Sequence, residues 1–371
     1  MYCEGNLKSP YVALLDADIG IPSPYEYMKP LIRSLSKQNI RACVLERGGY
    51  GFSDTGPLPR DGNHTLNEIV STIYESRMRT PFLYIAHSSA SFTARALASE
   101  YPELLSGMIL LHPSHEDQEL ILLKQVKNLT DNDIQLRKDT RDYIDDVIRY
   151  VNPIALPRLF KYFHFEFLLE YEDPYELYYM NGWKSYFDHI LNLTNTSINR
   201  KVIFQNKYTG CVWSELKHFQ SDTAESIKYL RFKSSINQNN NTTSSSSGNS
   251  GGNTAGNMII NNQSNSTLVN NDDDDDDDES YKKIPTIILT AKNLIDGNCE
   301  SNHFTEGSNM CNNFNMWKEG RGQAIKKLHS DLASFYNAKW DLIESSYDLP
   351  IDVPDVIAKY AKNLFLKIIK N

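Results

Sequence analysis

Cysteine is scarce in this chain of 371 residues: its five cysteines are widely spaced and include no C-x-x-C pair. The spacing predicts neither a disulfide framework nor a zinc site, and a reducing compartment is then the default. No apolar run approaches the roughly 18 residues that a membrane span needs, and the first residues lack the basic and apolar regions of a secretion signal. We therefore expect a cytoplasmic protein without a membrane span.

Positive charge is also in short supply, since 38 Lys and Arg residues oppose 47 Asp and Glu residues and give a formal net charge of -9. One acidic run, residues 272–279, supplies eight of the negative charges, so the remainder of the chain is nearly neutral. A neutral body has no Lys/Arg stripe to neutralise phosphates, which argues against nucleic acid as a partner. The hydrophobic fraction of 40% is sufficient for a sizeable core.

Short apolar runs alternate with helical patterns at both ends of the chain. Strand-like runs occupy 11–15, 42–45, 82–85, 107–111, 284–290 and 340–343, and helical patterns occupy 25–36, 66–76, 89–99, 322–335 and 355–369. This alternation predicts an α/β fold with a mostly parallel sheet and helices on both faces. Because the fifth run lies far downstream of the fourth, we expect the sheet to be interrupted and resumed.

Composition divides the interruption into two parts. Residues 114–232 combine charged and aromatic residues at helical spacing and predict a helical lid insertion between the core halves 1–113 and 283–371. Residues 233–282 are rich in Asn, Ser, Gly and Asp, which predicts a disordered, low-complexity insertion. The acidic run is interpreted either as an electrostatic tail for a basic partner or, more simply, as a neutral insertion.

The segment FLYIAHSSASF, residues 82–92, combines an apolar strand, a small-x-Ser-x-small turn and a helix. Alanines at Ala86 and Ala90 replace the glycines of the G-x-S-x-G nucleophile elbow, where larger residues would collide with neighbouring backbone. Such a turn would present the hydroxyl of Ser88 at the edge of the sheet. The N–H of Ser89, at the helix N-terminus, could then stabilise an oxyanion.

The blocks around this turn resemble, in order, those of the α/β-hydrolase superfamily, specifically its proline-iminopeptidase-like and esterase-like branch. They are LDADIG (15–20), ERGGYGFSD (46–54), RALASEYP (95–102), LLHPSHED (110–117), IPTIILT (284–290) and ESSYD with DVPD (344–355). The resemblance implies an α/β-hydrolase fold and a serine hydrolase with Ser88 as nucleophile. It also implies a small ester-like substrate, with an ester, thioester or peptide-like bond, and no cofactor or metal.

Several positions depart from the family pattern. Aligned on residues 352–355, the histidine of the triad falls on Tyr347, and a phenol with a pKa near 10 is a poor proton acceptor. The triad acid falls near Asn293, with Asp296 as the nearest carboxylate. Asp18 stands at the glycine-like position of the oxyanion loop, where an inward, ionised carboxylate would oppose an oxyanion.

Two functions remain open. In the first, Ser88 attacks an ester-like bond, the N–H groups of Ser89 and Asp18 bind the oxyanion, and His112 serves as a displaced base. We expect His112 on the same rim as Ser88, because it follows a neighbouring strand; the simpler interpretation is an ordinary rim histidine. In the second, the chain is a pseudo-hydrolase that binds a small ligand or a protein partner without turnover.

Overall fold

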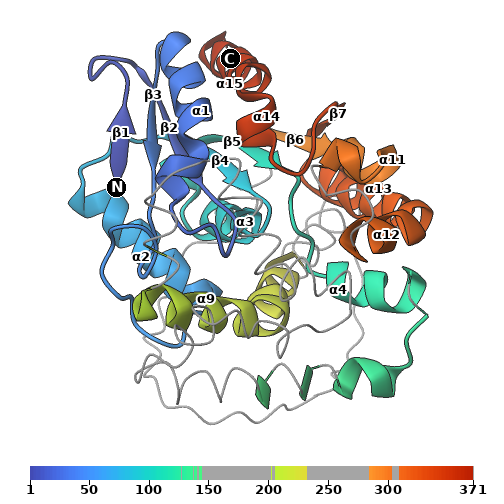
Figure 1. Ribbon diagram of the computed structural model, residues 1–371. Coiled ribbons are helices and arrows are strands. Elements are labelled where there is room, and N and C mark those ends of the chain that lie inside the picture. Colours follow the sequence, from blue (N-terminus) through green and yellow to red (C-terminus); the bar gives the residue numbers. More distant parts are fainter. Residues whose placement is uncertain are drawn as a thin grey trace, which may run out of the picture.

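The computed structural model describes residues 1–126, 128–136, 138–139, 142–143, 202, 205–231, 284–302 and 309–370. A seven-stranded sheet with the order β1-β3-β2-β4-β5-β6-β7 forms its centre (Figure 1). The strands are β1 (Tyr2–Glu4), β2 (Tyr11–Asp16), β3 (Ile40–Val44), β4 (Phe82–His87), β5 (Leu105–Leu111), β6 (Thr286–Ala291) and β7 (Lys339–Ile343). Every neighbouring pair is parallel except β1 with β3, so the predicted mostly parallel sheet is confirmed.

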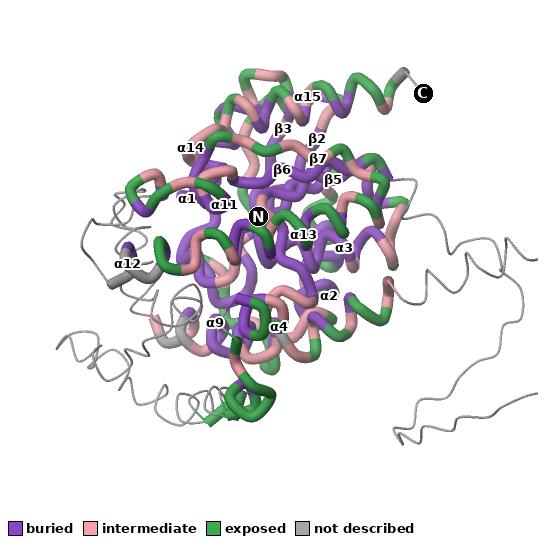
Figure 2. Tube along the Cα trace, turned by 90° about the vertical axis from the view of Figure 1, so that its right-hand side faces the viewer, coloured by how far each residue is buried: buried purple, intermediate pink, exposed green. Residues whose placement is uncertain are grey.

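The central strands are buried on both faces, and for this reason their sequences are continuous apolar runs rather than alternating ones. All six residues of β4 and of β6 are buried. Successive side chains point to opposite faces, so Leu14 and Leu15 belong to different hydrophobic clusters. The central strands are buried along most of their length, and exposed residues gather on the outer helices (Figure 2).

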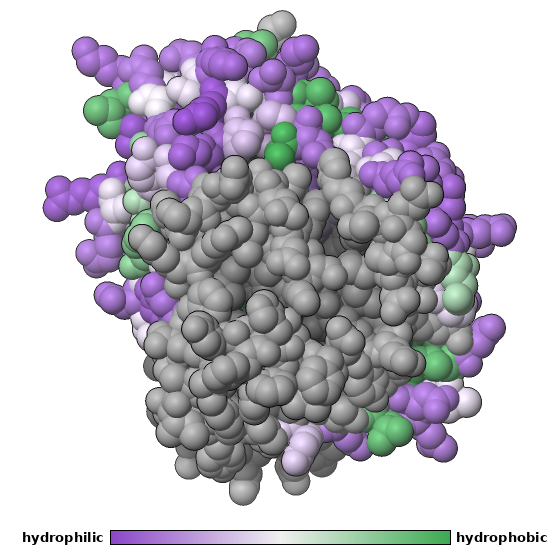
Figure 3. Space-filling model, viewed as in Figure 1, coloured by the Kyte–Doolittle hydropathy of each residue, from purple (hydrophilic) through white to green (hydrophobic). Residues whose placement is uncertain are grey.

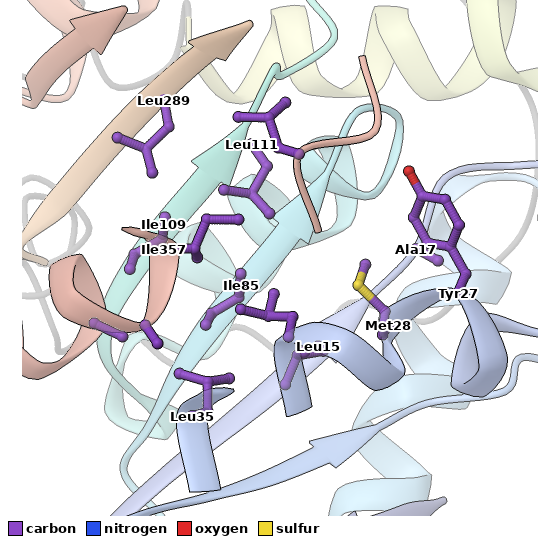
Figure 4. Packing of buried hydrophobic residues seen from close by; sticks show 14 of the residues in the cluster. Leu15, Ala17, Tyr27, Met28, Leu35, Ile85, Ile109, Leu111, Leu289 and Ile357 are labelled. Carbon is purple, nitrogen blue, oxygen red and sulfur yellow. The ribbon is translucent and has the colours of Figure 1, made fainter. Parts of the chain in front are cut away.

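Helices cover each face of the sheet. On one face, α1 (Pro24–Lys37), α14 (Leu349–Asp352) and α15 (Pro354–Lys370) pack Tyr27, Met28 and Ile357 against Leu15, Ile85 and Leu289 (Figure 4). On the other face, α2 (Gly62–Glu75), α3 (Ala90–Glu100) and α13 (Lys318–Phe335) contribute to the second cluster. The predicted helices on both faces are confirmed.

Between β5 and β6 the described chain is mainly helical. It contains α4 (Gln118–Ile121), the π-helix η2 (Leu122–Val126), α9 (Asn206–His218), the π-helix η5 (Phe219–Thr223) and a helical segment at 224–231. Glu215 on α9 lies between two core arginines, Arg47 and Arg60, and its carboxylate forms salt bridges of 3.1 and 2.9 Å with them. This buried ion pairing fixes α9 to the core. The predicted disordered insertion, 233–282, lies outside the described residues.

Two disulfides overturn the expectation drawn from cysteine spacing. Cys3 and Cys43 face each other in the antiparallel pair of β1 and β3, and Cys299 is joined to Cys311 on α12 (Asn309–Met316). The expectation was wrong because strand pairing brings together cysteines 40 residues apart in sequence. Cys211 is a buried free thiol.

The described part of the face seen in Figure 3 and the described helices show no large hydrophobic region. In the view of Figure 3 the described surface is mostly hydrophilic, and hydrophobic side chains occur only in small separate groups. None of the helices in the described part of the chain has the length and apolar content to cross a membrane.

Candidate functional site

Ser88 lies at the bend between β4 and α3. Its φ of 52° falls in the left-handed region, which is strained for a residue other than glycine. The bend is held by two backbone hydrogen bonds: the N–H of Ser88 donates to the carbonyl of Leu111 at 2.9 Å, and the N–H of Ser91 donates to the carbonyl of Ser88 at 2.9 Å. Ala86 and Ala90 are 0% and 1% exposed, so the crowding at these positions explains why both residues are small.

The Ser88 hydroxyl has another hydroxyl as its neighbour. Its Oγ lies 3.3 Å from the Oγ of Ser114, which follows β5. Within the described ranges no histidine nitrogen forms a hydrogen bond with Ser88. A hydroxyl that pairs with a hydroxyl is not activated as a nucleophile, because neither group is a base at neutral pH.

A carboxylate of the chain itself, that of Asp18, accepts hydrogen bonds from two backbone N–H groups, one of which directly follows Ser88. The N–H groups of Ile19 and Ser89 donate to Oδ1 of Asp18 at 2.9 and 3.1 Å, and the Ser89 hydroxyl also donates to it. Two convergent backbone N–H donors at about 2.7–3.1 Å, one after the serine and one from the loop after a neighbouring strand, are the geometry of an oxyanion hole. The second donor is the N–H of Ile19, one residue beyond the position named from the sequence.

Tyr347 completes the coordination of Asp18. The phenol O–H donates to Oδ2 of Asp18, and the side chain is buried. The ring contacts the imidazoles of His87 and His112, with centroids 4.7 and 5.6 Å apart. Both oxygens of Asp18 thus accept hydrogen bonds from neutral groups, and no described cation forms a salt bridge with it.

The loop that carries Tyr347 is held in place on both sides. The carboxylate of Asp352 accepts hydrogen bonds from the backbone N–H of Ser346 at 2.9 Å and from its hydroxyl at 2.6 Å. The carbonyl of Tyr347 accepts a hydrogen bond from Nε2 of His87 at 3.1 Å. The phenol is therefore preorganised to point at Asp18.

His112 directly follows β5 and also has a positive φ, of 43°. Its backbone N–H donates to the carbonyl of Leu289 at 2.7 Å, and its Nδ1 is buried with no hydrogen-bond partner in the described residues. Burial lowers the pKa of His112 well below its usual value, and His329 lowers it further, so the imidazole is neutral at pH 7. A neutral imidazole is the form that a general base requires, although none of the described hydrogen bonds joins it to Ser88.

His329 on α13 is a neighbour that the sequence did not single out. Its Nε2 lies 2.9 Å from the carbonyl of Pro113, which can only accept, so Nε2 carries the proton. Nδ1 then accepts from the Thr290 hydroxyl at 2.6 Å, and Trp340 donates to that hydroxyl at 2.8 Å. Burial lowers the pKa of His329 to about 3. Its helical spacing with Leu328 and Leu332 on the buried side of α13 is the signal that could have identified it.

The two acid candidates lie away from this cluster. Asn293 begins the short helix α11 (Asn293–Asp296), and its amide donates to the carbonyl of Ser301 at 3.0 Å. Asp296 ends the same helix and is exposed. None of the contacts in the described chain joins either residue to Ser88, His112 or Tyr347.

A second polar cluster joins Arg95 on α3 to the segment 115–116, which follows β5, and holds that segment in place. Arg95 forms a salt bridge of 2.7 Å with Glu116, and Arg231 pairs with both Glu116 and Asp331. His115 lies 2.9 Å from the same Asp331 carboxylate. Burial alone would raise the pKa of Glu116, but the adjacent Arg95 holds it below its usual value. The described residues contain no group of three or more side chains arranged to hold a metal ion.

Comparison with known proteins supplies the family. A model of the alpha/beta hydrolase fold matches residues 3–291 of the chain. An uncharacterized protein of Bacillus subtilis (strain 168), YbdG, is 30% identical over 111 residues, which cover 30% of this chain and 33% of that protein. The chain thus matches only about a third of the length of this curated relative.

Solved structures show the same architecture at low identity. An esterase from Thermogutta terrifontis has a TM-score of 0.52 at 11% identity, covering 99% of this chain and 92% of that one. A putative epoxide hydrolase from Pseudomonas aeruginosa has a TM-score of 0.51 at 11% identity, covering 99% and 91%. At such identities the likeness is one of fold.

Proposed function

This chain belongs to the α/β-hydrolase fold family, and we propose that within this family it is a pseudo-hydrolase, in which ester cleavage at Ser88 is reduced or lost. The site then acts as a binding module for a small ester-like ligand or a protein partner. The observation that carries the proposal is the position of Oδ1 of Asp18 between the N–H groups of Ile19 and Ser89.

The position of Asp18 opposes hydrolysis in two ways. The two backbone donors are already engaged, and removal of a single oxyanion donor from a serine hydrolase costs about 10²–10³ in turnover. A negative charge developing on a substrate oxygen would also meet the carboxylate at short range in a buried site, where Coulomb repulsion is weakly screened. Both effects raise the barrier for acyl transfer.

The base is the second deficiency. The phenol O–H of Tyr347 donates a hydrogen bond to Asp18. The phenol therefore keeps its proton and cannot act as the base that takes one from Ser88. Loss of one triad member typically lowers turnover by several orders of magnitude. Together with the engaged oxyanion donors, this supports a binding role more strongly than a catalytic one.

A fluorophosphonate probe tests the proposal, since it labels only an activated serine. We expect the wild-type protein to stay unlabelled at concentrations that saturate an active serine hydrolase within minutes. The double variant Asp18→Gly/Tyr347→His should gain labelling, and the same double variant carrying Ser88→Ala should lose it. Rapid labelling of the wild type that disappears in Ser88→Ala would refute the pseudo-hydrolase.

A second candidate is a serine hydrolase that uses His112 as its base. Two observations favour it: Ser88 keeps a strained φ of 52°, and His112 is neutral with its Nδ1 unengaged in the described chain. Strained residues cluster at functional sites, so the strain at Ser88 supports a hypothesis of function. Hydrolysis of p-nitrophenyl acetate that depends on both Ser88 and His112 would support this candidate, and activity unchanged in His112→Ala would eliminate it.

A further inference from the structure

A groove of about 420 Å³ lies on the side of α3 that faces α2 and the helical segment 224–231. Gly62, at the start of α2, and Thr223 both line it and lie so close that a Cβ added at Gly62 would be 2.8 Å from the Thr223 side chain. Small-molecule sites have volumes of about 300–1,000 Å³, so the groove is large enough for a ligand. All residues that line it belong to the described part of the chain.

The floor of the groove is apolar and packed. Phe92 and Ile227 are 1% and 3% exposed, and they form one hydrophobic cluster with Phe219 and Ala224. Ile19, which supplies an N–H to Asp18, packs against the same cluster. The cluster therefore separates the groove from the Ser88 site, and the groove is a distinct binding surface.

The rim of the groove is acidic. Glu100 on α3 and Glu225 on the helical segment are both exposed, and they are the acidic side chains among the lining residues. Within the described residues neither carboxylate has a salt-bridge partner. Hydroxyl groups of Thr93, Thr223 and Ser226 supply further polar contacts.

The cations closest in sequence to Glu225 are engaged elsewhere. Lys228 forms a salt bridge of 2.7 Å with Asp117, and Arg231 one of 2.6 Å with Asp331. They are held away from the acidic rim by these partners. An apolar floor beneath unneutralised carboxylates is complementary to a positive charge on an apolar body.

We propose that this groove is a second ligand-binding site, which takes a small organic cation with an apolar chain or ring. The apolar part packs against Ala96, Tyr229 and Leu230, the lining side chains that expose apolar surface above the packed Phe92 and Ile227, and the ammonium group lies between Glu100 and Glu225. Binding here is independent of any chemistry at Ser88.

Three ligands with the same eight-carbon chain test the charge preference: octylammonium, octanol and octanoate. Calorimetric titration of the full-length protein should detect octylammonium binding, with octanol about tenfold weaker and octanoate undetectable. Each of Glu100→Gln and Glu225→Gln should weaken octylammonium binding by about two- to fivefold, the scale of an exposed charge pair. Glu75→Gln, the same change at an exposed site outside the groove, should leave it unchanged.

Location is tested by Ser226→Trp, which fills the groove from a partly exposed position. This variant should abolish octylammonium binding while its circular dichroism spectrum and melting temperature stay close to those of the wild type. Equal affinity for all three ligands, no octylammonium binding, or octylammonium binding that survives in folded Ser226→Trp would each overturn the proposal. Higher ionic strength should weaken octylammonium binding but not octanol binding.

Discussion

Two buried carboxylates, Asp18 at the Ser88 site and Glu215 on α9, are satisfied in opposite ways. Glu215 lies between the guanidinium groups of Arg47 and Arg60 and also accepts from the phenol of Tyr50 at 2.7 Å. Asp18 accepts only from neutral donors in the described chain. The first arrangement balances full charges, and the second uses dipoles that in an active hydrolase would serve a transient anion.

The contrast separates structural stabilisation from altered function. Removing Glu215 would take away the carboxylate that both guanidinium groups share. Arg47 would keep only Asp16, at 3.6 Å, and Arg60 only Glu68, at 2.7 Å, so two buried positive charges would be balanced less well, which is costly. Removing Asp18 would leave only neutral donors unpaired and would reopen an anion-binding position. Glu215 should therefore matter most to folding and Asp18 most to the chemistry of the site.

The largest effect is expected for Glu215→Ala, which should lower the free energy of unfolding by about 3–5 kcal/mol. Urea denaturation followed by circular dichroism measures it. Glu75→Ala, an exposed position on α2, is the matched control and should change stability by less than about 0.5 kcal/mol. A loss below about 1 kcal/mol for Glu215→Ala would remove the contrast between the two carboxylates.

Acid should lower the free energy of unfolding through the buried histidines near Ser88, because the unfolded chain takes up protons that the fold excludes. The arginines around Glu215 keep their charge over this pH range and make no such contribution. The pKa values of His87, His112 and His329 are lowered by burial, that of His329 to about 3. The unfolded chain therefore binds more protons than the fold below pH 6.5. Stability should be constant above about pH 7 and fall, for each such histidine, by about 1.4 kcal/mol per pH unit as the pH decreases.

Urea denaturation at pH 8, 7, 6 and 5 tests this expectation in a range where most carboxylates stay ionised. For His329 the decline should continue to about pH 3, where the folded protein also takes up the proton. Equal stability at pH 7.5 and pH 5 would contradict the burial of neutral imidazoles.

A smaller effect is expected for Asp18→Ala, because the buried N–H of Ser89 loses its acceptor, whereas the N–H of Ile19 keeps the Ser89 hydroxyl as an acceptor at 2.9 Å. The free energy of unfolding should fall by about 1–3 kcal/mol. Acetate should then raise the melting temperature of the variant by mass action but leave that of the wild type unchanged. If acetate has the same effect on both proteins, Asp18 does not occupy an anion-binding position.

The smallest effect is expected for Tyr347→Phe, which removes one hydrogen bond to Asp18 and keeps the ring contacts with His87 and His112. Stability should fall by about 0.5–1.5 kcal/mol, the net contribution of one hydrogen bond. Paired denaturation curves of the variant and the wild type would detect it. A loss above about 3 kcal/mol would mean that the phenol hydroxyl stabilises the fold by more than its hydrogen bond to Asp18.

Much of the fold could be predicted because its strands and helices have strong local signals. The buried strands β4 and β6 are continuous apolar runs, and α15 has a regular amphipathic pattern. The three-residue β1 has no such signal, since its pairing with β3 depends on residues 40 positions away. The same dependence on tertiary pairing concealed the Cys3–Cys43 disulfide.

The sequence predicted where candidate residues fall along the chain, but not which contacts they make. The small-x-Ser-x-small pattern identified the bend at Ser88, and the distance from residues 352–355 identified Tyr347. The sequence shows an aspartate at position 18 but not the rotamer that brings its Oδ1 to the N–H groups of Ile19 and Ser89. His329 was missed because its contacts, with Thr290 and Pro113, join separate parts of the chain.

The pairing of β5 with β6 has a consequence for protein engineering. Leu110 and Ile288 are paired neighbours in the sheet, yet the whole segment from α4 to residue 285 lies between them in the sequence. The entropy of closing a long connection grows only with the logarithm of its length, by about 0.6 kcal/mol per doubling. Residues 233–282 should accordingly accept a deletion, an affinity tag or an inserted reporter domain with little change in the stability of the hydrolase core.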